Sequence, residues 1–200
     1  DSVLAIVPAR KDSKRLKLKN LRIFRGKPLF YWPLILSKKS KHIDKVVFTT
    51  DCKSMYFKAK KNFQILNYTR PKNLAKNDSL ARDVILDVLK KISFKFDYFI
   101  YLQPTSPLRT VRDIDNSLKM IETKKGNTLV SVTENSKKPN GMIYVSRTEF
   151  FLKKKSFKNK KIILFKTPYR RSIDIDYIKD LDHAKIIFWV FSVIVSDLID

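Results

Sequence analysis

The hydrophobic pattern alternates between short apolar runs and longer stretches in which apolar residues recur every three or four positions. Short runs rich in Val, Ile and aromatic residues predict strands, and the longer period predicts helices. The expected strands cover residues 3–8, 45–50, 64–68, 98–102, 128–132, 142–145 and 162–165. The expected helices cover residues 28–37, 52–61, 78–91, 110–124, 147–154 and 178–188.

Strands and helices therefore alternate, and several of the strands are apolar throughout. This pattern is typical of a mainly parallel sheet whose two faces are both covered by helices. We expect one three-layer α/β domain over residues 1–200. The last apolar segment, 189–195, predicts either an added strand or an apolar surface that pairs with another subunit.

Composition supports a folded domain and excludes some classes of protein. Hydrophobic residues make up 44% of the chain, which is enough for a sizeable core. Cys52 is the single cysteine, so an intrachain disulfide and a Cys-rich zinc site are excluded. The longest apolar stretch, 186–195, is too short to cross a bilayer of ~30 Å. We expect a soluble, cytoplasmic protein without a signal peptide or a membrane partner.

The charge is extreme, with 43 Lys and Arg against 19 Asp and Glu and a net charge of +24. Such a chain attracts polyanions, so a nucleic-acid-binding or polyanion-binding protein is one interpretation. The other interpretation is the codon bias of an AT-rich genome, since Lys, Asn and Ile abound and Gly occurs only 3 times. The second is favoured because the lysines are scattered and no nucleic-acid-binding module is recognisable.

Four polar loops follow expected strands, at residues 10–20, 49–51, 70–78 and 103–109. Ligands of open α/β sheets bind beyond the carboxyl ends of strands, so these loops predict a site. The first loop is rich in Arg and Lys, which suit a triphosphate. It holds neither a Walker motif nor G-x-G-x-x-G, so a P-loop and a dinucleotide site are disfavoured. By itself, the loop is compatible with a phosphate site or with a basic surface turn.

Seven short motifs, in order over roughly residues 3–187, give the chain a more specific character. They are Val7-Pro8-Ala9-Arg10 with Ser13-Lys14-Arg15-Leu16 and Lys19-Asn20, Gly26-Lys27-Pro28-Leu29, Phe48-Thr49-Thr50-Asp51, Arg70-Pro71, Gln103-Pro104-Thr105-Ser106-Pro107-Leu108-Arg109, Asn140-Gly141-Met142, and Ser172-Ile173-Asp174-Ile175-Asp176. This series resembles the acylneuraminate cytidylyltransferases, the CMP-N-acetylneuraminic acid synthetase-like family. The resemblance implies a glycosyltransferase-A-like nucleotidyltransferase fold, CTP as a substrate and a divalent cation, Mg²⁺ or another, as cofactor.

The resemblance also implies roles for single residues. It places the triphosphate and ribose against Arg10, Lys19 and Asn20. The remaining nucleotide-binding residues would be Ser13, Lys14, Arg70 and Ser79. The residues facing the sugar would be Gln103, Thr105 and Ser106, whose amide and hydroxyl groups suit a polyol acid. The catalytic residues would be Lys19, Arg10 and Asp176.

Asp174 and Asp176 form a separate candidate, a metal site. Two carboxylates two residues apart on an extended segment point the same way, and Mg²⁺ typically takes one or two carboxylates plus phosphate oxygens. Alternatively, Asp176 caps the following helix while Asp174 is merely solvated. The residues alone favour the cap, and the resemblance favours the metal.

The reaction implied by the resemblance is transfer of CMP from CTP to the anomeric hydroxyl of an acidic nine-carbon sugar, with release of pyrophosphate. Such an enzyme would serve cell-surface polysaccharide biosynthesis. The motifs do not distinguish N-acetylneuraminic, legionaminic and pseudaminic acids. A Kdo cytidylyltransferase is the nearest rival within enzymes, and Lys19-Asn20 argues against it.

The chain also departs from the family's pattern. Residues 132–141 leave no room for the insert that family members usually carry near 135–140, which contributes to the sugar pocket and to dimer contacts. The missing insert bears on the sugar, on a possible homodimer and on full activity. A nucleotide-binding relative that has lost or altered its catalysis is therefore a second interpretation.

Overall fold

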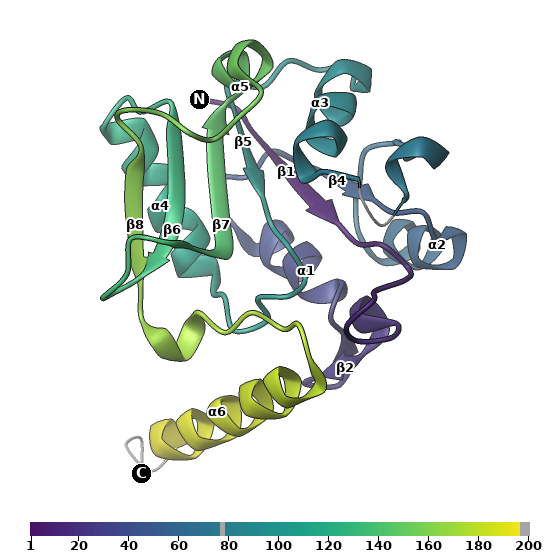
Figure 1. The fold of residues 1–200 in the computed structure, drawn as a ribbon, viewed down its shortest axis with the longest axis vertical. Helices are drawn as coiled ribbons and strands as arrows, with labels where there is room; N and C mark the ends of the chain where they lie inside the picture. Colours follow the sequence, from purple (N-terminus) through teal and green to yellow (C-terminus); the bar gives the residue numbers. More distant parts are fainter. Residues whose placement is uncertain (77–78, 197–200) are drawn as a thin grey trace.

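A six-stranded sheet forms the centre of the protein (Figure 1). The computed structural model describes residues 1–76 and 79–196, with side chains described as far as 193. The strand order is β4-β1-β5-β7-β6-β8. The strands are β1 (Val3–Pro8), β4 (Lys45–Thr49), β5 (Tyr98–Tyr101), β6 (Thr128–Thr133), β7 (Pro139–Arg147) and β8 (Ile163–Thr167). β7 runs antiparallel to both neighbours and the other pairs are parallel, so the expected mainly parallel sheet is confirmed.

Helices cover both faces of this sheet. One face packs against α1 (Tyr31–Lys39), α2 (Lys53–Asn62) and α4 (Val111–Thr123), and the other against α3 (Ala81–Lys91) and α5 (Thr148–Lys154). Alternation along β1 supplies both layers, because Val3, Ala5 and Val7 lie in the first core and Leu4 and Ile6 in the second. The expected three-layer α/β arrangement is therefore confirmed.

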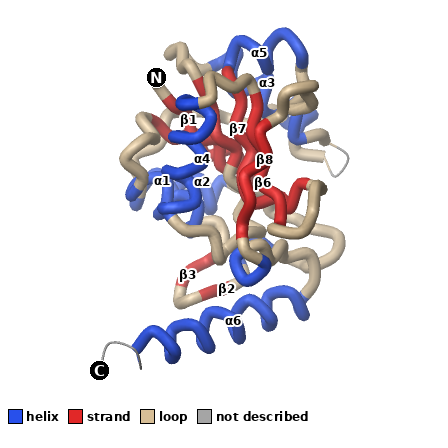
Figure 2. The backbone as a smooth tube through the Cα atoms, turned by 90° about the vertical axis from the view of Figure 1, so that its left-hand side faces the viewer, coloured by secondary structure: helices blue, strands red, loops and turns tan. Residues whose placement is uncertain are grey.

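A smaller layer lies beside the main sheet (Figure 2). Two short antiparallel strands, β2 (Ile23–Phe24) and β3 (Lys27–Pro28), pair there, and α6 (Ile178–Ser196) runs alongside them. The turn between the strands uses positive φ at Arg25 and Gly26, 50° and 76°. The Arg25 guanidinium then lies 3.9 Å from the ring centre of Phe188. This contact helps to hold α6 against the hairpin.

The starts of two expected helices and one expected strand were wrong. Pro28 belongs to β3, and the helix begins at Tyr31 rather than in the expected first turn at Pro28. α3 has Leu80 as its N-cap, so Ser79 precedes the cap, and Asp78 lies outside the described residues. The expected strand at 64–68 forms only an isolated bridge, Val47 to Leu66, because the chain meets the edge of the sheet at a single point.

The tail expected as an added strand is instead helical. α6 continues from Ile178 to Ser196 without a break at 188. Nothing in this stretch is a Gly or Pro that would end the helix. Trp189 on this helix is 66% exposed. Among the described residues, no helix is both long and apolar enough to span a bilayer.

The loops of the described chain contain three single-turn 3₁₀ helices: η1 (Lys19–Leu21), η2 (Lys72–Leu74) and η3 (Tyr169–Arg171). The carboxyl ends of the parallel strands β1, β4 and β5 share one edge of the sheet. The loops that follow these strands therefore meet there, as the sequence predicts.

The N-terminus of α4 provides a test of the local folding signals. The Thr110 hydroxyl accepts a hydrogen bond from the Asp113 backbone N–H at 3.1 Å, and the Asp113 carboxylate accepts one from the Thr110 backbone N–H at 3.0 Å. We expect Thr110→Ala to lower the free energy of unfolding by about 1 kcal/mol, since one N-terminal donor loses its acceptor. Urea denaturation measures this change. Thr123→Ala, at the exposed end of the same helix, is the control and should leave stability within about 0.5 kcal/mol.

Candidate active site

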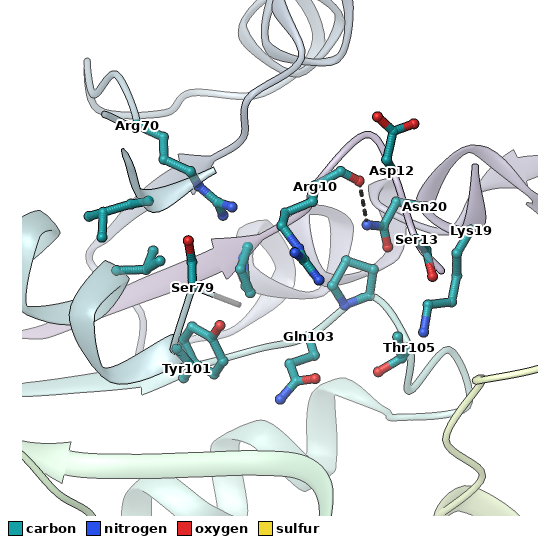
Figure 3. A pocket seen from close by; sticks show the side chains of 15 residues that line it. Arg10, Asp12, Ser13, Lys19, Asn20, Arg70, Ser79, Tyr101, Gln103 and Thr105 are labelled. Carbon is teal, nitrogen blue, oxygen red and sulfur yellow. Dashed lines mark hydrogen bonds between the residues drawn. The ribbon is translucent and has the colours of Figure 1, made fainter. Parts of the chain in front are cut away.

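The loops after β1 and β5, together with the segment between α2 and α3, enclose a cleft of about 240 Å³ (Figure 3). Cationic, amide and hydroxyl side chains converge on it from segments that are far apart in the sequence. Those labelled in Figure 3 are Arg10, Asp12, Ser13, Lys19, Asn20, Arg70, Ser79, Tyr101, Gln103 and Thr105. A cavity with this lining suits a polar, negatively charged ligand.

Asn20 closes the first loop into a defined shape. Its Nδ2 donates to the Arg10 carbonyl at 2.9 Å, which ties the two ends of the loop together. Its Oδ1 is buried, and no described residue donates to it. Asn20 lines the cleft, so this acceptor is available to a hydroxyl of a bound ligand.

Two arginines also line the cleft, Arg10 from the same loop as Lys19 and Arg70 from the segment before α3. Arg10 donates from Nη1 to the Lys76 carbonyl at 2.9 Å and so reaches across to the loop that precedes α3. Arg70 is buried, and its Nε and Nη2 donate to the Thr49 hydroxyl and carbonyl at 2.9 and 2.8 Å. Burial lowers the pKa of Arg70. Arg70 therefore braces the end of β4 and places positive charge on the cleft wall.

Lys19 joins the first loop to the acidic segment before α6. Its Nζ donates to the Ile175 carbonyl at 2.9 Å and lies 3.2 Å from Asp176 Oδ1. Arg15, which sequence reasoning did not include, reaches the other oxygen of Asp176 at 2.5 Å. Asp176 is therefore held by two cations. Asp176 does not cap α6. Instead, the Asp180 carboxylate accepts hydrogen bonds from the backbone N–H groups of Asp176 and Tyr177, just before the helix begins.

A buried arginine holds the loop 103–109 in place. Arg109 Nε donates to the Met142 carbonyl at 2.7 Å and Nη2 to the Gln103 carbonyl at 2.8 Å. Burial lowers the pKa of Arg109 to about 9, and Asp113 and Asp174 oppose this change. Sequence reasoning matched Arg109 to a motif but gave it no role. The structure shows that it fastens Gln103, at the cleft, to β7.

Asp174 stands beside the same loop. Its side chain reaches solvent, but protein atoms crowd it, and this desolvation raises its pKa. The Thr105 hydroxyl and Lys19 lower the pKa, while Asp176 and Asp180 raise it further. The Thr105 hydroxyl is close enough for this effect, yet it makes no hydrogen bond of good geometry with any described residue. Asp174 is thus a carboxylate whose negative charge lacks full compensation.

These two carboxylates fit the chemistry of a divalent cation. Oxygen ligands are what Mg²⁺ prefers, and one or two carboxylates suffice when phosphate oxygens complete the shell. A cation beside Asp174 would supply the charge compensation that it lacks. No cluster of three or more His, Cys, Asp or Glu in the described part of the chain could hold a metal by itself. A phosphate-bearing ligand would have to share the ion.

Most of the residues selected from sequence meet in this cleft. Arg10, Ser13, Lys19, Asn20, Arg70, Ser79, Gln103 and Thr105 line it. Lys14 is exposed and does not line it, and Ser106 is 2% exposed and faces the interior. Tyr101 lines the cleft but was missed. Its position at the end of β5, two residues before Gln103, was the available signal.

The chain is similar to known proteins over most of its length. A family model described as cytidylyltransferase matches residues 4–186. The chain belongs to the cytidylyltransferase family. The matched region includes the cleft loops and the Asp174–Asp176 segment.

Two curated relatives illustrate the range of this family. CMP-N,N'-diacetyllegionaminic acid synthase of Legionella pneumophila is 34% identical over 140 residues, covering 68% of this chain and 60% of the relative. N-acylneuraminate cytidylyltransferase of Escherichia coli is 26% identical, covering 91% of this chain and 51% of the relative. The chain thus spans about half to 60% of these relatives. The second alignment extends over 215 positions, so the relative has residues that this 200-residue cytidylyltransferase lacks within the aligned region.

Solved structures support the fold of this cytidylyltransferase. CMP:2-keto-3-deoxy-manno-octonic acid synthetase complexed with CTP superposes with a TM-score of 0.74 at 14% identity, covering 94% of this chain and 98% of that one. A cytidylyltransferase from Leptospira borgpetersenii gives 0.69 at 20% identity, covering 92% and 85%. The nucleotidyltransferase fold expected from the sequence is confirmed.

The raised pKa of Asp174 predicts a pH-dependent stability. The folded state favours the protonated form, so the stability contributed by this group is greatest near and below its ordinary pKa of 3.8 and is lost as pH rises through the raised value. In a chelator, Asp174→Asn should therefore be more stable than the wild type at pH 7, with the difference shrinking toward pH 4.

Urea unfolding across this pH range measures the effect. Asp182→Asn, an exposed acid on α6, is the matched control for removing one negative charge from this strongly basic chain. If both variants shift stability equally at every pH, the crowding of Asp174 is not the cause.

Proposed function

We propose that this cytidylyltransferase transfers CMP from CTP to the anomeric hydroxyl of a nonulosonic acid and releases pyrophosphate, with Mg²⁺ as cofactor. The observation that carries the proposal is the convergence of Arg10, Lys19 and Asn20 on one cleft, with Lys19 bound to the acidic segment beside it. The matched family, and the activities for which the Legionella and Escherichia relatives are named, support the reaction class. Both relatives are longer than this chain, so the complete reaction is proposed for it rather than transferred from them.

The nucleotide half of the reaction follows from the charged loop. Arg10 and Lys19 offset charge on the triphosphate, and their placement before binding reduces the reorganisation needed during the reaction. Asn20 Oδ1, which lacks a donor among the described residues, accepts a ribose hydroxyl. Arg70 and Ser79, on the opposite wall, contact the cytidine.

Asp174 and Asp176 would hold the Mg²⁺. The ion would neutralise phosphate charge and make the α-phosphorus more electrophilic. Thr105 lies next to Asp174, and the Thr105 carbonyl accepts from the Ile175 backbone N–H at 2.8 Å. This hydrogen bond keeps the proposed acceptor loop in register with the proposed metal segment.

Gln103 and Thr105 hold the acceptor. Their amide and hydroxyl groups can bind sugar hydroxyls, and the Arg109 clamp limits how far the loop can move. Positioning and charge neutralisation then account for most of the rate enhancement.

Asp176, bound by both Lys19 and Arg15, favours a second candidate function. A site whose carboxylate is already neutralised suits a relative that binds the nucleotide without turning it over. A pyrophosphate-release assay with CTP, Mg²⁺ and N-acetylneuraminic, legionaminic and pseudaminic acids separates the two. Release with any acid supports the synthetase, whereas calorimetric binding of CTP without release supports the non-catalytic relative.

Two substitutions test the assigned roles. We expect Lys19→Ala and Asp176→Asn each to lower kcat/KM by about 100-fold, because the first removes a cation from the phosphate site and the second removes a proposed ligand of Mg²⁺. Circular dichroism should show an intact fold. Lys14→Ala, in the same loop but outside the cleft, should retain activity within about twofold. Near-wild-type pyrophosphate release by Asp176→Asn would overturn the metal assignment.

A further inference from the structure

The helix α6 is apolar on the side that packs against the protein and also on part of the side that faces away. It runs along the base of the molecule, with the β2–β3 hairpin above it (Figure 2). The apolar residues of its inner side belong to a core shared with the hairpin: Leu181, Ala184, Ile187 and Phe188. Its outer face is formed by three exposed residues at helical spacing: Ile186, Trp189 and Val190. A helix that is apolar on both sides is ordinarily buried, so this outer face predicts a partner.

The surface beside the outer face is basic. Three hairpin cations are exposed and form no ion pair with an acid of the described chain: Arg22, Arg25 and Lys27. No Asp or Glu occurs between residues 13 and 43, a range that contains the whole hairpin. On α6, Asp180 and Asp182 precede the outer face, Lys185 is the one charged residue from 184 to 196, and Asp197 lies outside the described residues. The partner of this surface is therefore expected to be anionic.

A hollow of about 340 Å³ between α6 and η3 repeats this combination of apolar and cationic groups. Its apolar lining is Leu108, Ile187, Phe188 and Phe191. The Arg170 guanidinium lies 4.6 Å from the ring centre of Phe191, and no Asp or Glu is among the described residues that line the hollow. A cation at the rim of an apolar hollow suits a molecule with an anionic head and an apolar body.

Charge decides between the two occupants that would cover such a face, a second copy of this chain and a lipid surface. A second copy brings its own net charge of +24 and its own basic hairpin, so the two copies repel each other. An anionic bilayer instead offers phosphates above an apolar interior. A helix is about 10 Å across, so a helix lying at the headgroup boundary would hold the hairpin cations within about a Debye length of the phosphates. The lipid surface is therefore favoured.

We propose that α6 and the hairpin form a docking surface for an anionic membrane. The outer face of α6 enters the boundary between headgroups and acyl chains, and the hairpin cations face the lipid phosphates. The inference is independent of the proposed reaction. It departs from the sequence-based expectation of no membrane partner, which rested on the lack of a spanning segment. A helix that lies in the plane of the interface does not need the length or hydropathy of a spanning helix.

Trp189 is a natural reporter of insertion, because the only other tryptophan, Trp32, is half-buried and donates from Nε1 to the Phe24 carbonyl at 2.9 Å. The probe is a phosphatidylcholine vesicle with about 30% phosphatidylglycerol at about 0.15 M salt. We expect the emission to shift to shorter wavelength, and lipid brominated on its acyl chains to quench it. Trp189→Phe should still bind these vesicles but lose the quenching. Pure phosphatidylcholine vesicles should bind at least about tenfold more weakly.

Co-sedimentation with the same vesicles compares matched variants. Trp189→Ser should weaken binding roughly tenfold, whereas Phe57→Ser on α2, which removes a side chain of the same 66% exposure, should change it less than about twofold. The double variant Arg22→Gln/Lys27→Gln should also weaken binding roughly tenfold. Its control is Lys58→Gln/Lys61→Gln, which removes two exposed charges from α2, away from α6 (Figure 1). Circular dichroism should show an intact fold for every variant.

Three outcomes contradict the docking surface. Equal losses in the hairpin and α2 charge variants would mean that only the overall charge attracts the vesicles. Binding without quenching by brominated lipid would mean adsorption without insertion of α6. A dimer in sedimentation equilibrium that Trp189→Ser dissociates, together with unquenched emission, would assign the outer face to a second copy. None of these outcomes bears on the proposed reaction, because pyrophosphate release is assayed without vesicles.

Discussion

The cleft depends on the contact between Lys19 and the segment that precedes α6. Lys19 Nζ reaches the Ile175 carbonyl at 2.9 Å and Asp176 at 3.2 Å, and its side chain is only 13% exposed. A largely buried ammonium is costly unless several acceptors surround it, so these two partners must stay together. The consequence is that a loop near residue 19 and a segment near residue 175 form one wall. Arg15 and the Thr105 carbonyl hold the same acidic segment, so its position is fixed at several points.

A second buried cation fastens the opposite wall. Arg109 donates hydrogen bonds to the carbonyls of Gln103 and Met142. These two bonds join the loop after β5 to the antiparallel strand β7. Asp113 lies close enough to Arg109 to favour the charged form of the guanidinium. Asp113 is itself held by Arg171 at 2.8 Å and by the Thr110 hydroxyl at the cap of α4. Burial of this network makes its geometry hard to change, since an unpaired charge would cost several kcal/mol. The loop 103–109 is thus positioned by residues outside the cleft.

The sequence predicted those parts whose cause is local. Apolar runs predict β1 and β5, and Thr110 predicts the start of α4, because the signal and the structure involve the same few residues. The expected strand at 64–68 was wrong because pairing depends on a partner that period alone does not reveal. The same reason explains why Arg15 was missed: it contacts Asp176 across 161 residues. Ser106 matched a motif, but only the fold shows that its side chain is buried.

The two carboxylates of the acidic segment are unequal, and this inequality links the two ligands of the proposed site. Asp176 is neutralised by Lys19 and Arg15, whereas the pKa of Asp174 is raised, chiefly by desolvation and further by the neighbouring Asp176 and Asp180. A cation would therefore gain most at Asp174. A triphosphate that attracts Lys19 or Arg15 would weaken their hold on Asp176 and free a second oxygen ligand. Binding of nucleotide would then favour binding of metal, and linkage requires the reverse as well. The ion pairs of Asp176 thus stand where ligand contacts would form, which keeps this carboxylate compensated until the proposed ligands bind.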